Sequence, residues 1–375
     1  MDRAGQFISV LSGSNQYKAY KPNPLPSFPE LEMDEELVNL LSNAHESLGK
    51  LDAVSNLVPN LDLFISSYVR KEALISSQIE GTQATLEDVL NSDITNNCNL
   101  DVNDVLNYVN ALNYAIKRME NLPICNRLLC DTHKVLLQGV RGQEKFPGEF
   151  RRSQNWIGAT NSNINTARYV PPTVEDMKDA MSDLEKFIND YDMDILLKTA
   201  LVHYQFETIH PFLDGNGRIG RMLIVLMLLS NKILSKPVLY LSLYLKTNRV
   251  EYYDRLSEVR KKGDYEQWIK FFLLGINQTS LDCIETIKSI DTLLKDDENK
   301  INIKSQKQKL IFDYIKQHPI VSISKTSKDL DISFNTVSIF VTKLVNLNIL
   351  KKTSNKERDK VFEYTNYIEV LKQGI

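Results

Sequence analysis

Hydrophobic residues recur at helical spacing over most of this chain, from about residue 35 to residue 295. In the segment 61–69, for example, the apolar residues lie three and four positions apart, which places them on one face of a helix. The stretch 218–231 is hydrophobic on nearly all sides, as expected for the buried central helix of a bundle. A chain of 375 residues, 42% of them hydrophobic, is long enough to bury such a core. These patterns predict an all-α fold built around a helical bundle.

Two stretches depart from the helical pattern. Residues 142–172 contain three glycines, three prolines and a run rich in Asn, Ser and Thr. This composition predicts a β-hairpin with residues 154–157 as one arm and residues 168–170 as the other. Residues 1–30 are predicted to be irregular, because four of the ten residues from Lys21 to Glu30 are prolines.

The sequence predicts three parts. Residues 1–100 form an N-terminal helical region, in which residues 62–79 are one helix that ends at Glu80-Gly81. Residues 101–295 form the core, which ends in two separate helices. The core helices are expected at residues 104–120, 126–138, 173–190, 193–208, 218–231, 248–261, 264–278 and 279–295.

A polar run over residues 295–306 predicts a linker to a third part, residues 305–375. Three short helices followed by two short strands around a charged turn predict a winged helix-turn-helix domain there. From residue 301 onward the chain has thirteen Lys/Arg and seven Asp/Glu, a balance of +6, so the first 300 residues carry −9. A basic module indicates an anionic partner, and one hypothesis is a DNA-binding regulator whose recognition helix is residues 333–347. Winged helices also bind proteins, so both partners stay open.

The longest strongly apolar stretch, Met222–Leu229, is too short to cross a bilayer, which needs roughly 20 residues. The first ten residues do not resemble a signal peptide, so we expect a cytoplasmic chain with no membrane partner. Cys125, Cys130 and His133 lie close together in sequence, but their spacing fits no zinc pattern. Buried free thiols are therefore expected, and His203 is expected to be a core histidine.

One segment, His210 to Arg221 (HPFLDGNGRIGR), concentrates chemically useful residues. Gly215 and Gly217 permit positive φ, so that backbone N–H groups can converge on an anion where a new helix begins. Arg218 and Arg221 lie three apart on that helix, which puts both guanidinium groups on one side. Arginine binds phosphate oxygens in bidentate geometry. The segment therefore predicts a site for a polyphosphate.

Two further residues of this segment complete the predicted site. Asp214 offers a hard oxygen ligand suited to Mg²⁺. His210 can accept a proton near neutral pH. The segment lacks the Gly-Lys-Ser/Thr of a Walker P-loop and the acidic pattern of an EF-hand, so neither of these sites is predicted.

The segment matches at every fixed position the signature of the Fic family, His-x-Phe-x-Asp/Glu-Gly-Asn-Gly-Arg-x-x-Arg, and the chain is identified by this resemblance as a Fic protein. The resemblance implies an all-α bundle with a β-hairpin flap that transfers AMP from ATP to a Ser, Thr or Tyr hydroxyl of target proteins, releasing pyrophosphate. It implies His210 as the catalytic base and Asp214 as the Mg²⁺ ligand. It also implies an anion hole and two phosphate-binding arginines, which are Gly215, Asn216, Gly217, Arg218 and Arg221.

A second motif, Ser76 to Gly81 (SSQIEG), resembles the family's inhibitory motif Ser/Thr-x-x-x-Glu-Gly/Asn. The resemblance implies that Glu80 pairs with Arg221 and holds the enzyme inactive. A solvated helix-end glutamate is the alternative.

The segment from Gly148 to Pro172 resembles the flap of the family more loosely. The resemblance implies that Ile157, Gly158, Ala159 and Thr160 approach the nucleotide, and that Tyr253 lines the adenine pocket. An ordinary surface hairpin and simple packing are the alternatives. Self-modification, a homodimer and removal of AMP at the same site also stay open.

Overall fold

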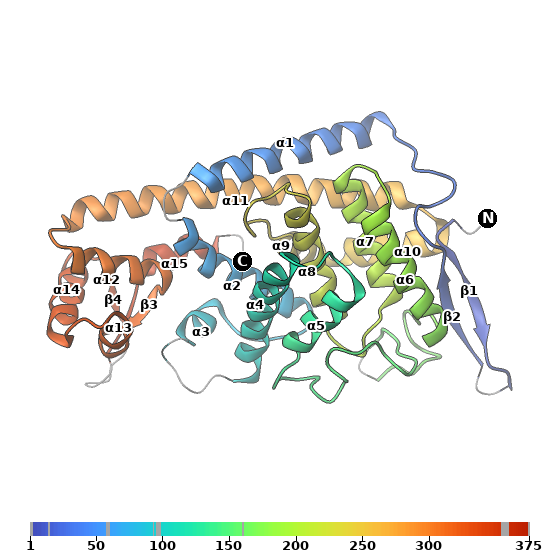
Figure 1. Ribbon diagram of the computed structural model, residues 1–375, viewed down its shortest axis with the longest axis horizontal. Coiled ribbons are helices and arrows are strands. Elements are labelled where there is room, and N and C mark those ends of the chain that lie inside the picture. The colour runs from blue at the N-terminus through green and yellow to red at the C-terminus, as the bar shows by residue number, and fades with distance from the viewer. Residues whose placement is uncertain are drawn as a thin grey trace. The chain divides into compact units, whose positions relative to one another are not determined.

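The computed structural model describes residues 3–13, 16–57, 61–92, 94, 99–159, 161–353 and 360–373, with backbone only for 61–64. The described residues are mostly helical, so the predicted all-α class is confirmed (Figure 1). The helices are α1 Glu35–Leu57, α2 Leu61–Ile79, α3 Leu86–Asn91, α4 Leu100–Met119, α5 Asn126–Leu136, α6 Val174–Asp190, α7 Ile195–Ile209, α8 Asn216–Ser230, α9 Ser242–Thr247, α10 Arg249–Lys262, α11 Tyr265–Ile301, α12 Gln306–Gln317, α13 Ile323–Leu330, α14 Phe334–Asn346 and α15 Thr365–Lys372. The strands are β1 Gly5–Val10, β2 Tyr17–Pro22, β3 Ile320–Ser322, β4 Lys351–Lys352 and β5 Val361–Glu363. None of the described helices is long and apolar enough to cross a bilayer.

The chain forms two compact units. Unit 1 comprises Met1–Gly49, Asn107–Ser235 and Leu239–Thr279. Unit 2 comprises Lys50–Leu106, Lys236–Val238 and Ser280–Ile375.

The core of unit 1 is the packed pair α7 and α8. Every residue of α7 from Leu196 to Ile209 is buried, and so is every residue of α8 from Asn216 to Leu228. The predicted buried central helix at 218–231 is therefore confirmed. Trp268 of α11 is completely buried and donates its indole N–H to the carbonyl of Ala200 on α7 at 2.9 Å. This core fixes the two helix ends between which the predicted polyphosphate site lies.

The N-terminal residues form a β-hairpin, so the prediction of irregular structure over residues 1–30 is wrong. β1 pairs with β2 antiparallel, with Phe7 opposite Tyr20. The residues on either side of the turn at Gly13 favour β-strands. The prolines that follow them outweighed this pattern in the prediction. The backbone N–H of Tyr20 also donates to the carbonyl of Val170 at 3.0 Å, so β2 lies along the second arm of the predicted flap.

The predicted flap hairpin is reduced to one bridge in the described residues. Ile157 and Tyr169 exchange two backbone hydrogen bonds, of 2.8 and 3.1 Å, and no longer ladder forms around them. Pro171 and Pro172 lack N–H groups and cannot extend the pairing. Thr160 lies outside the described residues.

α11 is continuous from Tyr265 to Ile301, so the predicted division into two helices and the predicted linker start at residue 295 are both wrong. Its polar end is supported by charge pairs one turn apart. Lys295 contacts Asp291 at 2.6 Å and Lys300 contacts Asp297 at 2.8 Å. The same end is also packed, because Ile301 is fully buried and Asp297, which is 1% exposed, accepts the hydroxyl proton of Tyr364 at 2.7 Å.

The C-terminal part of unit 2 has the order α12, β3, α13, α14, β4, β5, with a three-stranded antiparallel sheet ordered β3-β5-β4. This order is compatible with the predicted winged helix-turn-helix, which stays a prediction. The charged turn at residues 354–359 lies outside the described residues. α15, which follows β5, was not predicted.

α2 in unit 2 confirms the helix predicted at 62–79, and the following Gly81 has a φ of 101°. α2 packs against α12 and α15. Lys71 of α2 is buried and donates to the carbonyl of Gln373 at 2.7 Å, just after α15 ends. Lys372 pairs with Glu87 of α3. The last helix of the chain is thereby attached to α2 and α3.

We expect Leu201→Ala to lower the free energy of unfolding of unit 1 by about 2–5 kcal/mol, because Leu201 is 1% exposed and its truncation leaves a cavity between packed helices. Urea unfolding followed by Trp268 fluorescence in a Trp156→Phe background measures this. Lys186→Ala on the exposed side of α6 is the control, with an expected change within about 0.5 kcal/mol. Equal effects of the two variants would contradict the assignment of α7 to the core.

Candidate active site

The predicted site residues from His210 to Arg221 lie on the turn between α7 and α8. His210 ends α7 in the left-handed conformation, with a φ of 51°, and its N–H donates to the carbonyl of Phe206 at 2.9 Å. Gly215, with a φ of 76°, precedes the first residue of α8. The left-handed conformation is unfavourable for a residue with a side chain, so the surroundings must hold His210 in place.

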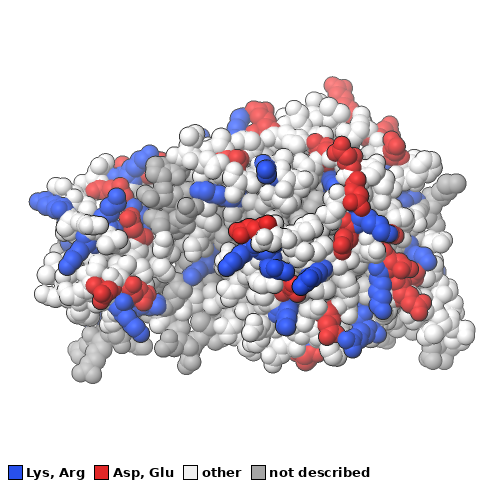
Figure 2. All heavy atoms as spheres, in the orientation of Figure 1, with Lys and Arg blue, Asp and Glu red and all other residues white. Residues whose placement is uncertain are grey.

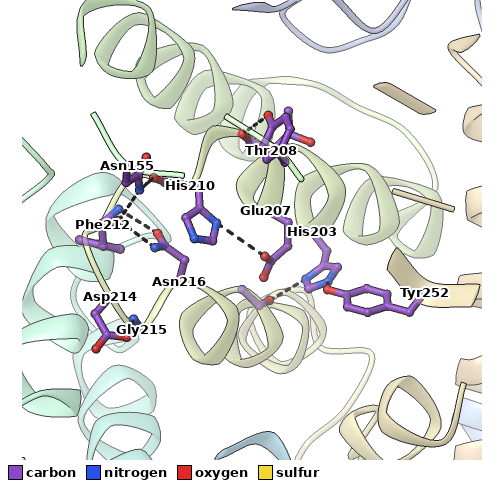
Figure 3. Close-up of polar contacts among 12 residues, drawn as sticks. Asn155, His203, Glu207, Thr208, His210, Phe212, Asp214, Gly215, Asn216 and Tyr252 are labelled. Atoms are coloured by element: carbon purple, nitrogen blue, oxygen red, sulfur yellow. Dashed lines mark hydrogen bonds and ion pairs between the residues drawn. The ribbon is translucent and has the colours of Figure 1, made fainter. Parts of the chain in front are cut away.

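Asn216 closes this turn with its side chain (Figure 3). Its Oδ1 accepts the N–H of Phe212 and its Nδ2 donates to the carbonyl of Phe212, both at 2.8 Å. Asn216 is 2% exposed, so neither hydrogen bond competes with water. The side chain of Asn216 therefore serves the turn, which leaves its backbone for the predicted anion hole.

Two residues of the flap segment, Arg151 and Asn155, brace the turn, and neither role was predicted from the sequence. Arg151 is 1% exposed and donates from Nε to the carbonyl of His210 at 3.1 Å. Burial lowers the pKa of Arg151 to about 10, so it remains charged near neutral pH. Asn155 donates from Nδ2 to the carbonyls of His210 and Phe212 at 3.2 and 3.0 Å. Both side chains thus donate to the carbonyl of His210, a group that is costly to bury without a partner.

His133 of α5 braces the other end of the turn. Its Nδ1 accepts the N–H of Gly148 at 2.9 Å, so Nε2 carries the proton and donates to the carbonyl of Asp214, also at 2.9 Å. The ring stacks on Phe212, with centroids 3.8 Å apart and planes 8° from parallel. Burial lowers the pKa of His133 to about 4, which keeps the ring neutral.

These contacts leave His133 with no nitrogen for a metal. The described residues contain no group of three His, Cys, Asp or Glu that could hold one. Cys125 and Cys130 are free thiols, as expected.

Three charged residues lie at the start of α8: Asp214, Arg218 and Arg221. The Asp214 side chain is 40% exposed, and its Oδ1 accepts the N–H of Gly215 at 2.6 Å and lies 3.5 Å from Nη2 of Arg218. Arg218 and Arg221 are 5% and 3% exposed. Two buried guanidinium groups beside the positive end of a helix attract an anion.

The carboxylate of Glu207 on α7 was not predicted as part of the site. Its Oε2 lies 4.0 Å from Nδ1 of His210, and its side chain is 9% exposed (Figure 3). A Cβ at position 220 would overlap Oε1 of Glu207, so Gly220 on α8 provides the space for this carboxylate.

His203 is a core residue, as predicted. Its Nδ1–H donates to the carbonyl of Gly220 at 2.9 Å, so its Nε2 accepts the hydroxyl proton of Tyr252 at 2.9 Å (Figure 3). Burial lowers the pKa of His203 to about 4, so this ring is also neutral.

A cavity of about 310 Å³ lies beside the turn in unit 1. The flap residues Ile157, Gly158 and Ala159 line this cavity together with Tyr253, although more than ninety positions separate them from Tyr253 in the sequence. Glu207 also lines the cavity. The ring of Tyr253 lies 5.5 Å from the guanidinium of Arg168 and 5.7 Å from that of Arg249. The cationic lining consists of Arg168, Arg249, Arg260 and Lys261. An anionic, flat ligand suits such a lining.

Glu80 follows α2 in unit 2, and Arg221 belongs to unit 1. Their pairing therefore stays a prediction.

Two family models match the chain: the Fic/DOC family N-terminal model over residues 38–117 and the Fic/DOC family model over residues 123–228. The chain therefore contains a Fic/DOC family N-terminal domain and a Fic/DOC family domain over these residues.

Known proteins agree with this assignment. The protein adenylyltransferase Fic of Nematostella vectensis is 25% identical over 295 residues, 71% of this chain and 63% of that protein. The protein of the same name from Culex quinquefasciatus is 30% identical over 174 residues, 45% of this chain and 31% of that protein. The chain thus spans less than two thirds of the length of these curated relatives.

Solved structures support the fold. A Fic family protein from Desulfovibrio desulfuricans G20 has a TM-score of 0.58 and 19% identity, covering 89% of this chain and 97% of that one. A Fic domain containing signaling protein from Bacteroides thetaiotaomicron VPI-5482 has a TM-score of 0.51 and 17% identity, covering 68% of this chain and 95% of that one. The predicted Fic bundle is confirmed.

We expect stability to fall as pH is lowered from 7 to 5, in part because of His133 and His203. Their pKa values are about 4 in the folded chain, below the ordinary value of 6.5 in the unfolded chain, so the unfolded state binds protons first as pH falls. Each histidine then contributes a loss of about 2 kcal/mol between pH 7 and pH 5. Urea unfolding of His203→Gln should show a pH dependence smaller by about that amount. An unchanged dependence would contradict a neutral, buried His203.

Proposed function

We propose that this chain transfers AMP from ATP to a Ser, Thr or Tyr hydroxyl of a target protein. One observation carries the proposal: His210 ends α7 on a braced turn directly before a helix start that holds two buried arginines, Arg218 and Arg221. The proton acceptor, His210, therefore lies next to the arginines that would bind phosphate. The relatives named protein adenylyltransferase Fic support the same activity.

In this reaction the target oxygen forms a bond to the α-phosphorus of ATP while the bond from that phosphorus to the bridging oxygen breaks. Pyrophosphate leaves, and the hydroxyl proton goes to His210. The backbone N–H groups of Gly215, Asn216 and Gly217 and the side chains of Arg218 and Arg221 hold the phosphates.

Asp214 is the residue that would hold Mg²⁺. Its exposed carboxylate is a hard oxygen donor beside the phosphate site, and Mg²⁺ is usually held by one or two carboxylates together with substrate phosphates and waters. When bound, Mg²⁺ neutralises charge on the phosphates. Gly142 supports this fit, because a Cβ there would crowd Oδ2 of Asp214, and its absence keeps that oxygen accessible.

The cavity lined by Tyr253 and by Ile157, Gly158 and Ala159 suits the adenosine part of ATP, through stacking and apolar contact. Backbone groups of the flap beyond the bridge at Ile157 are suited to pair with an extended target segment.

We further infer that Glu80 restrains this activity by pairing with Arg221. A carboxylate at a phosphate-binding arginine competes for the same guanidinium, so the γ-phosphate is displaced and the α-phosphate is turned away from the attacking oxygen.

We expect incubation with α-labelled ATP, Mg²⁺ and lysate of the source cells to label one or more proteins. His210→Ala should reduce labelling by about 10²–10⁴-fold, because general-base catalysis is lost, while ATP binding is retained. Parallel incubation with γ-labelled ATP is the control, because AMP transfer leaves the γ-phosphate in pyrophosphate. Label from γ-labelled ATP on protein would indicate a kinase instead. Full labelling by His210→Ala would remove His210 from its role.

We expect Glu80→Gly to raise AMP transfer to lysate proteins and to itself by about 10–100-fold, because a misplacement of about 1 Å can cost roughly 10²-fold in rate. Glu80→Gln should act in the same direction, since it removes the charge and keeps the shape. Gln83→Gly, which adds a glycine to the same connection between α2 and α3, is the matched control and should leave the rate unchanged. A Glu80→Gly rate equal to that of the unmodified chain would refute the restraint.

DNA binding through residues 305–375, removal of AMP, a homodimer and a cytoplasmic location stay predictions. The described surface gives DNA binding little support. Phe334 and Ile339 of α14 are 55% and 65% exposed, and the one basic residue of that helix, Lys343, donates to the carbonyl of Ile301 at 2.5 Å. On the face shown in Figure 2, Lys and Arg are interspersed with Asp and Glu. Binding to the DNA phosphates requires Lys and Arg side chains that are available on the surface that contacts DNA.

A further inference from the structure

We propose that Glu207 is a positioning residue that orients His210 as the proton acceptor. The proposal rests on the proposed AMP transfer, in which His210 takes the proton of the target hydroxyl. Glu207 lies outside the signature segment, one helical turn before His210 on α7.

The two side chains point toward each other (Figure 3). The 4.0 Å between Oε2 of Glu207 and Nδ1 of His210 joins groups that are only 9% and 19% exposed. At this exposure water screens their attraction less than it would on the open surface.

The space around the carboxylate is fitted to it. Gly220 on the facing helix α8 lacks the Cβ that would overlap Oε1. A buried carboxylate is costly unless it is paired, and the ring of His210 is a partner within its reach.

The consequence for His210 concerns its two ring nitrogens. Glu207 attracts a proton on Nδ1, which leaves Nε2 as the acceptor for the target hydroxyl. When Nε2 takes that proton the ring becomes positive, and the carboxylate stabilises it, as the acidic member of a catalytic triad does.

Other charges in unit 1 act on the ring in both directions. Four arginines disfavour a positive charge on the ring of His210. Arg151 donates to the carbonyl of His210, and Arg260 of α10 lines the cavity together with Glu207. The other two, Arg218 and Arg221, lie in the first turns of α8. Asp214 is the other carboxylate of the turn, and it already contacts Arg218 at 3.5 Å. Glu207 is therefore the carboxylate of α7 and α8 that faces the ring.

The first measurement is a histidine NMR titration without ATP. The chain has five histidines, and the His210 signal is assigned by its loss in His210→Asn. Glu207→Gln should lower the pKa of His210 by about one unit, because the neutral amide no longer favours the imidazolium. Glu175→Gln on the exposed surface of α6 is the matched control and should leave that pKa unchanged.

The second measurement is the pH profile of AMP transfer. In Glu207→Gln the acid limb of kcat should move to lower pH by the same amount, and kcat at its plateau should fall at least about tenfold with KM for ATP nearly unchanged. Glu207→Asp, which keeps the charge, should recover part of the rate. A purely structural role would lower kcat without moving the acid limb.

Gly220→Ala provides an independent test, because its methyl group displaces the Glu207 carboxylate while both side chains remain. It should lower the pKa of His210 in the same direction, and it replaces Glu207→Gln if that variant does not fold by circular dichroism. An unchanged titration of His210 in the folded variants would overturn the proposal. A shifted titration with no AMP transfer by either the unmodified chain or Glu80→Gly would refute the proposed function while supporting the pairing of Glu207 with His210.

Discussion

The turn between α7 and α8 depends on a pair of hydrogen bonds between one buried side-chain amide, that of Asn216, and the backbone of Phe212. A backbone group left unpaired at this depth costs about 1–3 kcal/mol, so a turn inside the core exists only if side chains replace water. Asn155, Arg151 and His133 provide further donors to the carbonyls of this turn. Together they keep His210 in a left-handed conformation that it would not adopt alone.

The electrostatics of unit 1 follow from the same arrangement. Arg218 and Arg221 are buried charged side chains in an otherwise apolar helix, and Asp214 lies 3.5 Å from Arg218. The cavity in unit 1 is lined by further cations around Tyr253 and by Glu207. This concentration of cations suits an anionic ligand with an aromatic part, whose affinity should decrease as salt is added.

The sequence predicted features that are local in the chain. The signature segment is contiguous, and the helix at 62–79 follows from its periodicity. Arg151, His133 and Glu207 were missed because their roles depend on distant or side-chain partners that no short pattern encodes. The β1–β2 hairpin was missed because the prolines after it outweighed a short alternating pattern. The continuity of α11 was missed because its polar end is held by charge pairs and by contacts with distant residues, such as that of Asp297 with Tyr364, which no short pattern encodes.

The hydrogen bond from Lys71 to the carbonyl of Gln373 joins residues that are 302 positions apart. A ribosome that adds about 5–20 residues per second needs roughly 15–60 s to pass from one to the other. During that interval α2 has been synthesised, but α12 and α15, which pack against it, have not. The Lys71 ammonium therefore finds its carbonyl partner only after residue 373 has been made. The helix that ends just before Glu80 thus receives α3 early and α12 and α15 late, and a product that terminates before α15 would leave Lys71 without this hydrogen bond.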